Sequence, residues 1–173
     1  MTSVSIIMST YSRNRSEGNC PNLLRRALDS IVNQTFKDFE LVLLDDGSVD
    51  GSEQVCREYA DKYKFINYIR FEENSGLPAK RYNDGIDASK SDYIMFMFDD
   101  DKLYQNAVKE LYDAITEKYS GFAMVYGLVN YMNASAGGPL AYNFGAEWDV
   151  ERIKSQNFLC NNSVIIKRSV ALS

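Results

Sequence analysis

Short apolar runs alternate along this chain with segments whose apolar residues recur at helical spacing, and this alternation limits the folds available to it. The runs are nearly continuous, as strands are when both faces of a sheet are buried. Such strands joined by helices predict an α/β domain in three layers, with a mostly parallel sheet between helices. The predicted strands are 4–8, 39–44, 65–71, 93–98 and 122–128, and helices are predicted to begin near Pro21, near Asp50, at Pro78 and at Ala107.

Size and composition narrow the class of protein further. A length of 173 residues suits one domain with a buried core. The formal charge of −5 argues against nucleic acid or an anionic membrane as a partner. Cys20, Cys56 and Cys160 are odd in number and widely spaced, which favours a reducing, cytoplasmic environment over a disulfide framework. We expect no secretory leader and no transmembrane segment, because no apolar run is long enough.

Three consecutive aspartates, Asp99, Asp100 and Asp101, follow the apolar run 93–98. Adjacent carboxylates repel one another unless a cation or hydrogen-bond donors neutralise them. Because successive side chains of an extended segment alternate, Asp99 and Asp101 are expected to converge while Asp100 faces elsewhere. The sequence has no histidine, so a bound metal would be held by oxygen and would be Mg²⁺ or Mn²⁺. A solvated turn that caps the next helix is the plainer interpretation.

Polar residues also follow two other predicted strands. Asp46 lies in the segment 45–48, whose residue types are also common in turns, and Ser9, Thr10 and Tyr11 end the first strand. Ligands of parallel α/β sheets bind at the carboxyl ends of the strands, where all these residues are expected. Asp46 is suited to accept an N–H from a nucleobase, and Tyr11 to stack on one, with Ser9 or Thr10 at its edge.

A basic residue, Arg81, lies early in the predicted helix from Pro78, beside Gly76 and Asn83. Its guanidinium is suited to bind phosphate or to pair with a carboxylate. For a single arginine, a solvated surface charge is the competing interpretation.

Taken in order, these motifs resemble family 2 glycosyltransferases of the GT-A fold. The resemblance rests on the segments 4–11, 30–36, 38–48 and 83–101, and it covers about residues 3–128. It implies transfer of a sugar from a nucleotide-diphosphate donor, commonly a UDP-sugar, with inversion at the anomeric carbon. It also implies a divalent ion, Mn²⁺ or Mg²⁺, and a saccharide or lipid-linked acceptor. The enzyme would then work in the cytoplasm, either free or peripherally at the inner face of the membrane.

The resemblance also assigns roles to individual residues. Asp99 and Asp101 would form the DxD motif, with the first acid on the ribose side and the last on the metal, while Asp100 fits either role. Arg81 would contact phosphate. The nucleotide-sugar would be held by Ser9, Thr10, Tyr11, Asp46, Arg81, Asp99 and Asp100, and the metal by Asp101 and Asp99. Two departures are a serine at position 9 instead of proline, and Tyr82 between Arg81 and Asn83.

The general base is the residue that the sequence leaves unassigned. Within the single domain 1–173, the resemblance divides a nucleotide-sugar-binding half, 1–128, from the start of an acceptor-side half, 129–173. The family usually supplies its base from an acidic motif after a segment like 158–168, where this chain ends. We therefore expect a truncated chain that binds donor and is inactive by itself. Asp149 and Glu147 are the candidates that remain, since the base must be a carboxylate.

Other classes of protein share some of these features. A sugar-1-phosphate nucleotidyltransferase would have a Gly-rich basic loop after the first strand, whereas the segment 11–20 has one glycine, Gly18. A receiver-type signalling domain would have its acidic pair after the first strand and a lysine after the last. A domain that only binds a nucleotide or another partner in the same cleft is the remaining alternative.

Overall fold

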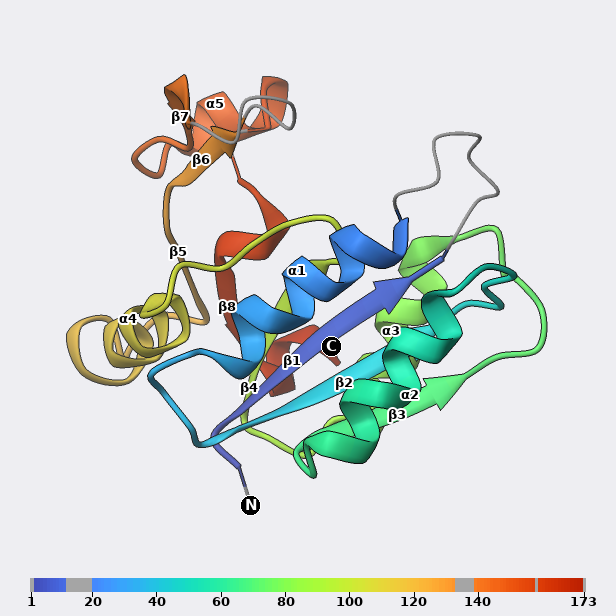
Figure 1. Ribbon diagram of the computed structural model, residues 1–173. Helices are drawn as coiled ribbons and strands as arrows, with labels where there is room; N and C mark the ends of the chain where they lie inside the picture. The colour runs from blue at the N-terminus through green and yellow to red at the C-terminus, as the bar shows by residue number, and fades with distance from the viewer. Residues whose placement is uncertain (1, 12–19, 133–138, 158, 173) are drawn as a thin grey trace.

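The computed structural model describes residues 2–11, 20–132, 139–157 and 159–172, so the segment 12–19 lies outside the described residues. Its main sheet has the strand order β3-β2-β1-β4-β8-β5 (Figure 1). The strands are β1 Val4–Thr10, β2 Phe39–Asp45, β3 Ile66–Arg70, β4 Tyr93–Phe98, β5 Met124–Tyr126 and β8 Val164–Lys167. A separate two-stranded sheet pairs β6 Val129–Met132 with β7 Pro139–Phe144. The predicted α/β class is confirmed.

The helices begin close to where the sequence predicts them. In α3, proline occupies the first turn, where its missing N–H costs no hydrogen bond. The predicted helix from Ala107 is α-helical at first and then continues as a π-helical segment, 114–118. The helices are α1 Cys20–Val32, α2 Ser52–Lys62, α3 Pro78–Ala88, α4 Ala107–Asp113, α5 Val150–Ser155 and α6 Arg168–Ala171.

Strand direction divides the main sheet into two parts. β1 is parallel to β2 and β4, and β2 is parallel to β3. β8 runs antiparallel to both β4 and β5. Because it is antiparallel to β4, β8 begins towards the edge where β4 ends. The short 3₁₀ turn before it, Asn161–Ser163, is thereby brought near the carboxyl end of β4.

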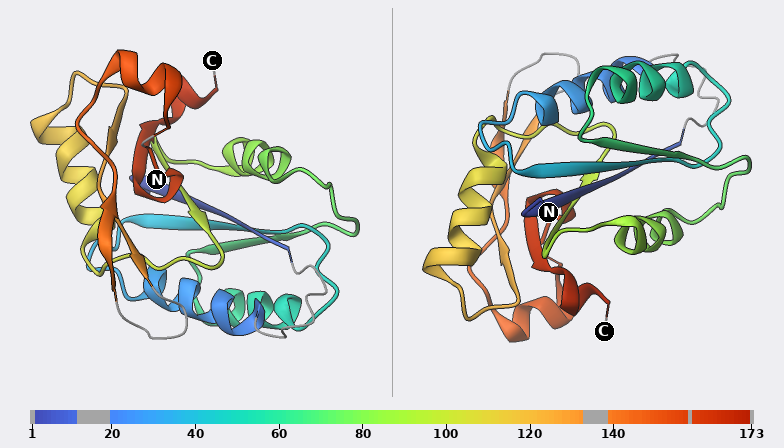
Figure 2. Two further views of the ribbon diagram at one scale, coloured as in Figure 1. Left: turned by 90° about the horizontal axis from the view of Figure 1, so that it is seen from above. Right: turned by 90° about the horizontal axis from the view of Figure 1, so that it is seen from below.

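Helices cover both faces of the sheet, as Figure 2 shows. On one face, α1, α2 and α4 pack over a large apolar cluster that includes Leu28, Leu43 and Val108. On the other face, α3 packs over a smaller cluster that includes Ile7 and Ile86. The strands between them are buried on both sides, which explains their nearly continuous apolar sequences.

Gly85 lets α3 approach the sheet closely. A Cβ atom at this position would lie 2.3 Å from Cγ2 of Ile7 and 3.1 Å from Cδ1 of Leu44. Gly85→Ala is therefore expected to lower the free energy of unfolding by about 1–3 kcal/mol through overpacking. Urea denaturation measures this change, and Gly121→Ala is the control, because a Cβ there meets nothing within 4 Å. Equal stability of the two variants would contradict the close packing.

Residues after β5 form a less regular part of the chain. β6, β7 and α5 lie together at one end of the molecule, beyond the main sheet (Figure 1). Over the ranges that the structure describes, no helix has the length and apolar character needed to cross a membrane.

Candidate functional site

The carboxyl ends of β1, β2 and β4 meet at one edge of the main sheet. Thr10 lies opposite Asp45 in the β1–β2 register, and Ser9 lies opposite Phe98 in the β1–β4 register. The backbone N–H of Asp46 donates to the carbonyl oxygen of Thr10 at 2.9 Å. The sheet therefore brings together the three polar segments that the sequence predicts at its carboxyl edge.

The aspartate cluster begins directly after β4 and contacts β1. Thr10 Oγ1 donates to Asp99 Oδ2 at 2.6 Å, so the hydroxyl fixes one carboxylate oxygen of the cluster. Asp99 and Asp101 are half-buried whereas Asp100 is exposed, which agrees with the alternation expected from the sequence. The backbone carbonyl of Asp100 accepts from Nη2 of Arg26, which lies on α1, at 2.5 Å.

In the electrostatic environment of this cluster, burial and mutual repulsion of the acids outweigh the opposing hydrogen bonds and the charge of Arg26. Burial raises the pKa of Asp99, and the charge of Asp100 raises it further, against the opposing hydrogen bond from Thr10. Burial and the Asp100 charge likewise raise the pKa of Asp101, against the opposing effects of Asn162 and Arg26. Both shifts mean that the ionised carboxylates are disfavoured here. A cation at this edge would stabilise them.

Asn162 is a residue of the site that the sequence did not identify. It lies in the 3₁₀ turn before β8, and its Nδ2 donates to Asp101 Oδ2 across a long sequence separation. Only 8% of Asn162 is exposed. Its Oδ1 is buried and has no hydrogen-bond partner among the residues that the structure describes. No local pattern indicates this contact, because it depends on where β8 joins the sheet.

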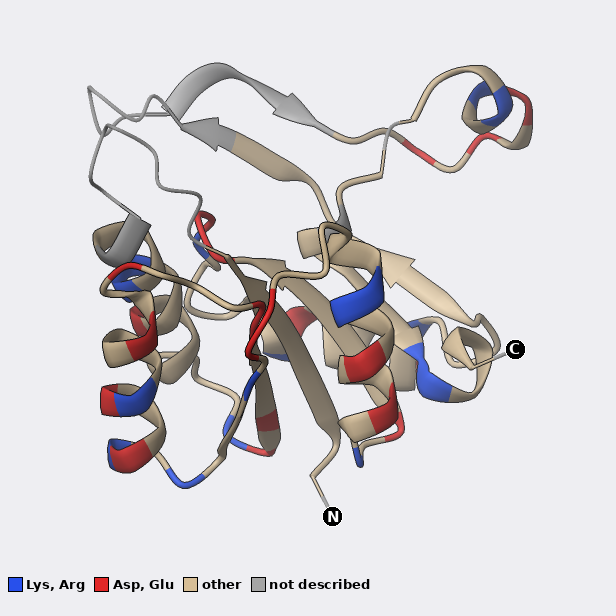
Figure 3. Cartoon of the chain, turned by 90° about the vertical axis from the view of Figure 1, so that its right-hand side faces the viewer, with Lys and Arg blue, Asp and Glu red and all other residues tan. Residues whose placement is uncertain are grey.

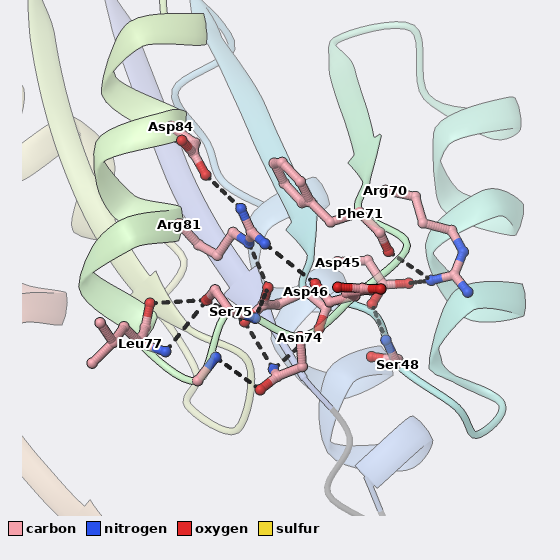
Figure 4. A network of polar contacts seen from close by, with 12 residues as sticks. Asp45, Asp46, Ser48, Arg70, Phe71, Asn74, Ser75, Leu77, Arg81 and Asp84 are labelled. Atoms are coloured by element: carbon pink, nitrogen blue, oxygen red, sulfur yellow. Dashed lines mark hydrogen bonds and ion pairs between the residues drawn. The ribbon is translucent and has the colours of Figure 1, made fainter.

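Asp46 lies at the centre of a buried polar network, shown in Figure 4. Its Oδ1 accepts from Arg81 Nε at 2.5 Å and from the backbone N–H of Ser75 at 3.0 Å. Its Oδ2 accepts from Asn74 Nδ2 and from Ser75 Oγ, both at 2.8 Å. Only 3% of Asp46 is exposed. A carboxylate has about four acceptor positions, so all of them are in use here.

The neighbouring turn allows the loop after β3 to reach Asp46. Gly47 has a positive φ of 76°, and a Cβ there would lie 2.8 Å from the backbone nitrogen of Asn74.

Asp45 is fully buried, and its carboxylate accepts from the backbone N–H of Ser48, from the hydroxyl of Tyr68 and from the guanidinium of Arg70. These partners offset the desolvation of the Asp45 carboxylate.

Arg81 is buried in the same network, with 4% of the residue exposed. Its Nη1 donates to Asp84 Oδ2 at 2.7 Å, and its guanidinium lies 3.5 Å from the ring centre of Phe71. The solvated surface charge considered for this arginine is therefore wrong. The described contacts occupy the guanidinium with carboxylates and an aromatic ring, so its predicted contact with phosphate stays a prediction.

Two aromatic rings border the carboxyl edge. Tyr11 follows β1 directly and is 37% exposed. Tyr82, on α3, packs edge-on against Phe96 and Phe98. Burial raises the pKa of Tyr82, and the nearby charges of the aspartate cluster raise it further. Tyr82 therefore lies close to the acids, although sequence analysis considered it only as a departure from the family pattern.

The two candidates for the general base lie apart from these contacts. Asp149 is the N-cap of α5, and its Oδ1 accepts from the backbone N–H groups of Glu151 and Arg152, each at 2.9 Å. Glu147 is exposed, and its charge helps to raise the pKa of Tyr126. Among the described hydrogen bonds, none joins either carboxylate to Asp99 or Asp101. Helix capping explains Asp149 without a catalytic role.

The donor atoms of the edge fit a hard divalent cation. Within the described ranges, no three side chains among aspartate, glutamate and cysteine come close enough to form an all-protein metal cage. Mg²⁺ and Mn²⁺ at nucleotide sites are commonly held by one or two carboxylates, with water and phosphate completing the shell. Asp99 and Asp101 supply that number of half-buried carboxylates.

Away from this edge, positive and negative side chains are mixed. Figure 3 shows basic and acidic residues interspersed along the outer helices.

Comparison with known proteins establishes the family. Residues 5–170 match the family model described as "Glycosyl transferase family 2", and the chain belongs to this family of enzymes. A poly(ribitol-phosphate) beta-N-acetylglucosaminyltransferase, TarP of Staphylococcus aureus, is 34% identical over 116 residues, which are 65% of this chain and 33% of that protein. The chain spans between 15% and 33% of the length of four curated relatives that it matches.

Solved structures show the same fold. The structure of S. aureus TarS 1-349 in complex with UDP-GlcNAc has a TM-score of 0.71 at 20% identity, and covers 98% of this chain and 46% of that one. A mannosyltransferase from Pyrobaculum calidifontis, in complex with GDP-Man and Mn²⁺, has a TM-score of 0.67 at 15% identity, and covers 99% and 46%. The predicted GT-A fold is confirmed, and family membership disfavours the nucleotidyltransferase and receiver alternatives.

Proposed function

We propose that this chain binds a nucleoside diphosphate sugar, with a UDP-sugar as the donor, for inverting transfer of the sugar to an acceptor hydroxyl. The observation that carries the proposal is the continuous series of contacts along the carboxyl edge, from Asp46 through Thr10 to Asp99 and, by way of the aspartate cluster, to Asp101. A relative of known structure binds UDP-GlcNAc, and another binds GDP-Man with Mn²⁺, which supports this class of ligand.

The nucleobase would bind at the Asp46 end of the edge. All acceptor positions of Asp46 are in use, so a base N–H must replace one of its present donors. The Ser75 hydroxyl is suited to leave, because its oxygen also lies 3.2 Å from the carbonyl oxygen of Leu77. Rotation of that hydroxyl towards Leu77 would free Asp46 Oδ2 for the base. Tyr11 is exposed at the end of β1 and would stack on the base, with Ser9 at its edge.

The ribose and diphosphate would bind at the other end. Thr10 holds one oxygen of Asp99, and this carboxylate would accept a ribose hydroxyl or face the cation. Asp101, with Asp99, would hold Mn²⁺ or Mg²⁺, and Asp100 is exposed beside them. When bound, the cation supplies stabilisation of the negative charge on the departing diphosphate. Raised pKa values at both acids support this assignment, since burial and the charge of Asp100 disfavour their ionised forms until a cation binds.

Inversion requires the acceptor oxygen to attack the anomeric carbon from the face opposite the diphosphate. The bond to the diphosphate breaks as the new glycosidic bond forms, and a carboxylate takes the acceptor proton. Residues 129–173 would begin the acceptor side of the domain. The acceptor would be a saccharide or a lipid-linked or polymeric hydroxyl, in line with the name of the TarP relative.

Cys56 and Cys160 are free thiols, which supports a reducing, cytoplasmic location.

Calorimetry with UDP and GDP, each with and without Mn²⁺, tests the proposed ligand class. We expect UDP to bind with Mn²⁺ at least about tenfold more tightly than without it, which corresponds to 1.4 kcal/mol. Competition of a panel of UDP-sugars with bound UDP then identifies the donor. Binding of UDP that does not respond to Mn²⁺ or Mg²⁺ would contradict the metal-dependent site, and preferential binding of GDP would contradict the choice of nucleotide.

A further inference from the structure

The amide of Asn162 meets the aspartate cluster from a distant part of the chain. Its Nδ2 donates to Asp101 Oδ2, although 61 residues separate the two in sequence. The turn that carries it precedes β8, and β8 is held between β4 and β5 by antiparallel pairing. The position of the amide is therefore set by the sheet rather than by a free loop.

The other atom of the same amide is unsatisfied. Oδ1 of Asn162 is buried and has no hydrogen-bond partner within the described residues, while 8% of the residue is exposed. A buried carbonyl oxygen without a partner destabilises the fold, so such atoms in folded proteins usually face a water, an ion or a ligand. Because both amide atoms share one carbon, Oδ1 lies beside the Asp101 carboxylate that Nδ2 contacts.

We propose that Asn162 belongs to the metal-binding site, with Oδ1 as an oxygen ligand of the cation that Asp101 binds and Nδ2 as the donor that positions Asp101. This inference rests on the proposed function. Amide carbonyl oxygens are suitable ligands for hard cations, and they add no charge to an edge that already has three aspartates. The donor and the ligand would come from one side chain, which links the turn before β8 to the acids after β4.

Two substitutions separate the two roles of the amide. Asn162→Ala removes both the donor and the oxygen, whereas Asn162→Asp removes the donor but retains an oxygen ligand. Ser163→Ala is the matched control, because Ser163 is buried in the same turn and its Oγ donates to the carbonyl oxygen of Cys160. Thermal unfolding of each variant shows whether it is folded before its metal affinity is measured.

Binding of Mn²⁺ in the presence of UDP, followed by electron paramagnetic resonance, tests the inference. We expect Asn162→Ala to weaken Mn²⁺ binding by about tenfold or more, which is typical of losing a ligand or its support. Ser163→Ala should bind like the parent chain, and Asn162→Asp, which retains an oxygen ligand, should bind clearly more tightly than Asn162→Ala. The inference is overturned if Asn162→Ala binds like Ser163→Ala, or if Asn162→Asp binds no better than Asn162→Ala. Failure of the parent chain to bind Mn²⁺ with UDP would instead overturn the proposed function.

Discussion

Asp101→Ala is expected to abolish Mn²⁺-dependent binding of UDP and, in a longer chain that includes the general base, to slow the release of UDP from a UDP-sugar by about three orders of magnitude. Asp101 is the half-buried acid at the end of the cluster, and its Oδ2 already accepts from Asn162. Loss of its carboxylate would remove a cation whose stabilisation of the leaving diphosphate is worth about 4 kcal/mol. Calorimetry with UDP and Mn²⁺ measures the first effect, and coupled detection of UDP measures the second.

A surface aspartate provides the matched control for this variant. Asp113 pairs with Lys109 on the exposed side of α4 and has no described contact with the carboxyl edge. Asp113→Ala should leave the affinity for UDP with Mn²⁺ unchanged, because exposed ion pairs contribute little. Retention of Mn²⁺-dependent UDP binding by Asp101→Ala at the level of Asp113→Ala would show that the aspartate cluster does not hold the cation.

Arg81→Met should produce the largest loss of stability, about 3–5 kcal/mol of the free energy of unfolding. Arg81 and Asp46 form an ion pair in which both side chains are only 5% exposed, with 2.5 Å between Nε and Oδ1. Removal of the guanidinium leaves the buried Asp46 carboxylate without its charged partner and uncovers the face of Phe71. Urea denaturation measures the effect. Binding of UDP should also weaken, because Arg81 helps to hold the proposed base-binding residue.

Two further variants test how much of this loss of stability comes from the buried ion pair between Asp46 and Arg81. Lys109→Met breaks an exposed ion pair and should cost less than about 1 kcal/mol. The double variant with Asp46→Asn and Arg81→Met should be less destabilised than the sum of its single variants, by about 0.5–3 kcal/mol, because position 46 no longer has a buried unpaired charge. Strict additivity of the two single changes would contradict direct coupling between Asp46 and Arg81.

Most of the fold could be predicted from the sequence because its signals are local. The apolar run ending at Met8 predicts β1, which extends to Thr10, and Pro78 predicts the start of α3. The antiparallel position of β8 between β4 and β5 could not be predicted, because its apolar residues indicate a strand but not its neighbours. The position of β8 depends instead on the path of the chain after β5.

In the candidate site, too, some contacts could be predicted from local sequence patterns and others depend on tertiary packing. Strand periodicity is enough to place Thr10, Asp46 and Asp99 at one edge, since parallel strands end together. The donors that saturate Asp46 come from the loop after β3 and from α3, and their contacts depend on tertiary packing. The hydrogen bond from Asn162 to Asp101 depends most on tertiary structure, because it requires the β4–β8 pairing. Sequence patterns therefore identified the acids and two of the residues that hold them, Thr10 and Arg81, but not Asn74, Ser75 or Asn162.

The most direct test of a cation-bridged diphosphate at the carboxyl edge is the paramagnetic effect of Mn²⁺ on the backbone amide resonances of the isotope-labelled chain. With UDP present, substoichiometric Mn²⁺ should broaden the resonances of Thr10, Asp99 and Asp101 first and leave those of α5 and the amino-terminal end of β1 sharp. Without UDP, the broadening should be much weaker. Broadening that is centred elsewhere, or that is the same with and without UDP, would contradict a shared site for the metal and the diphosphate.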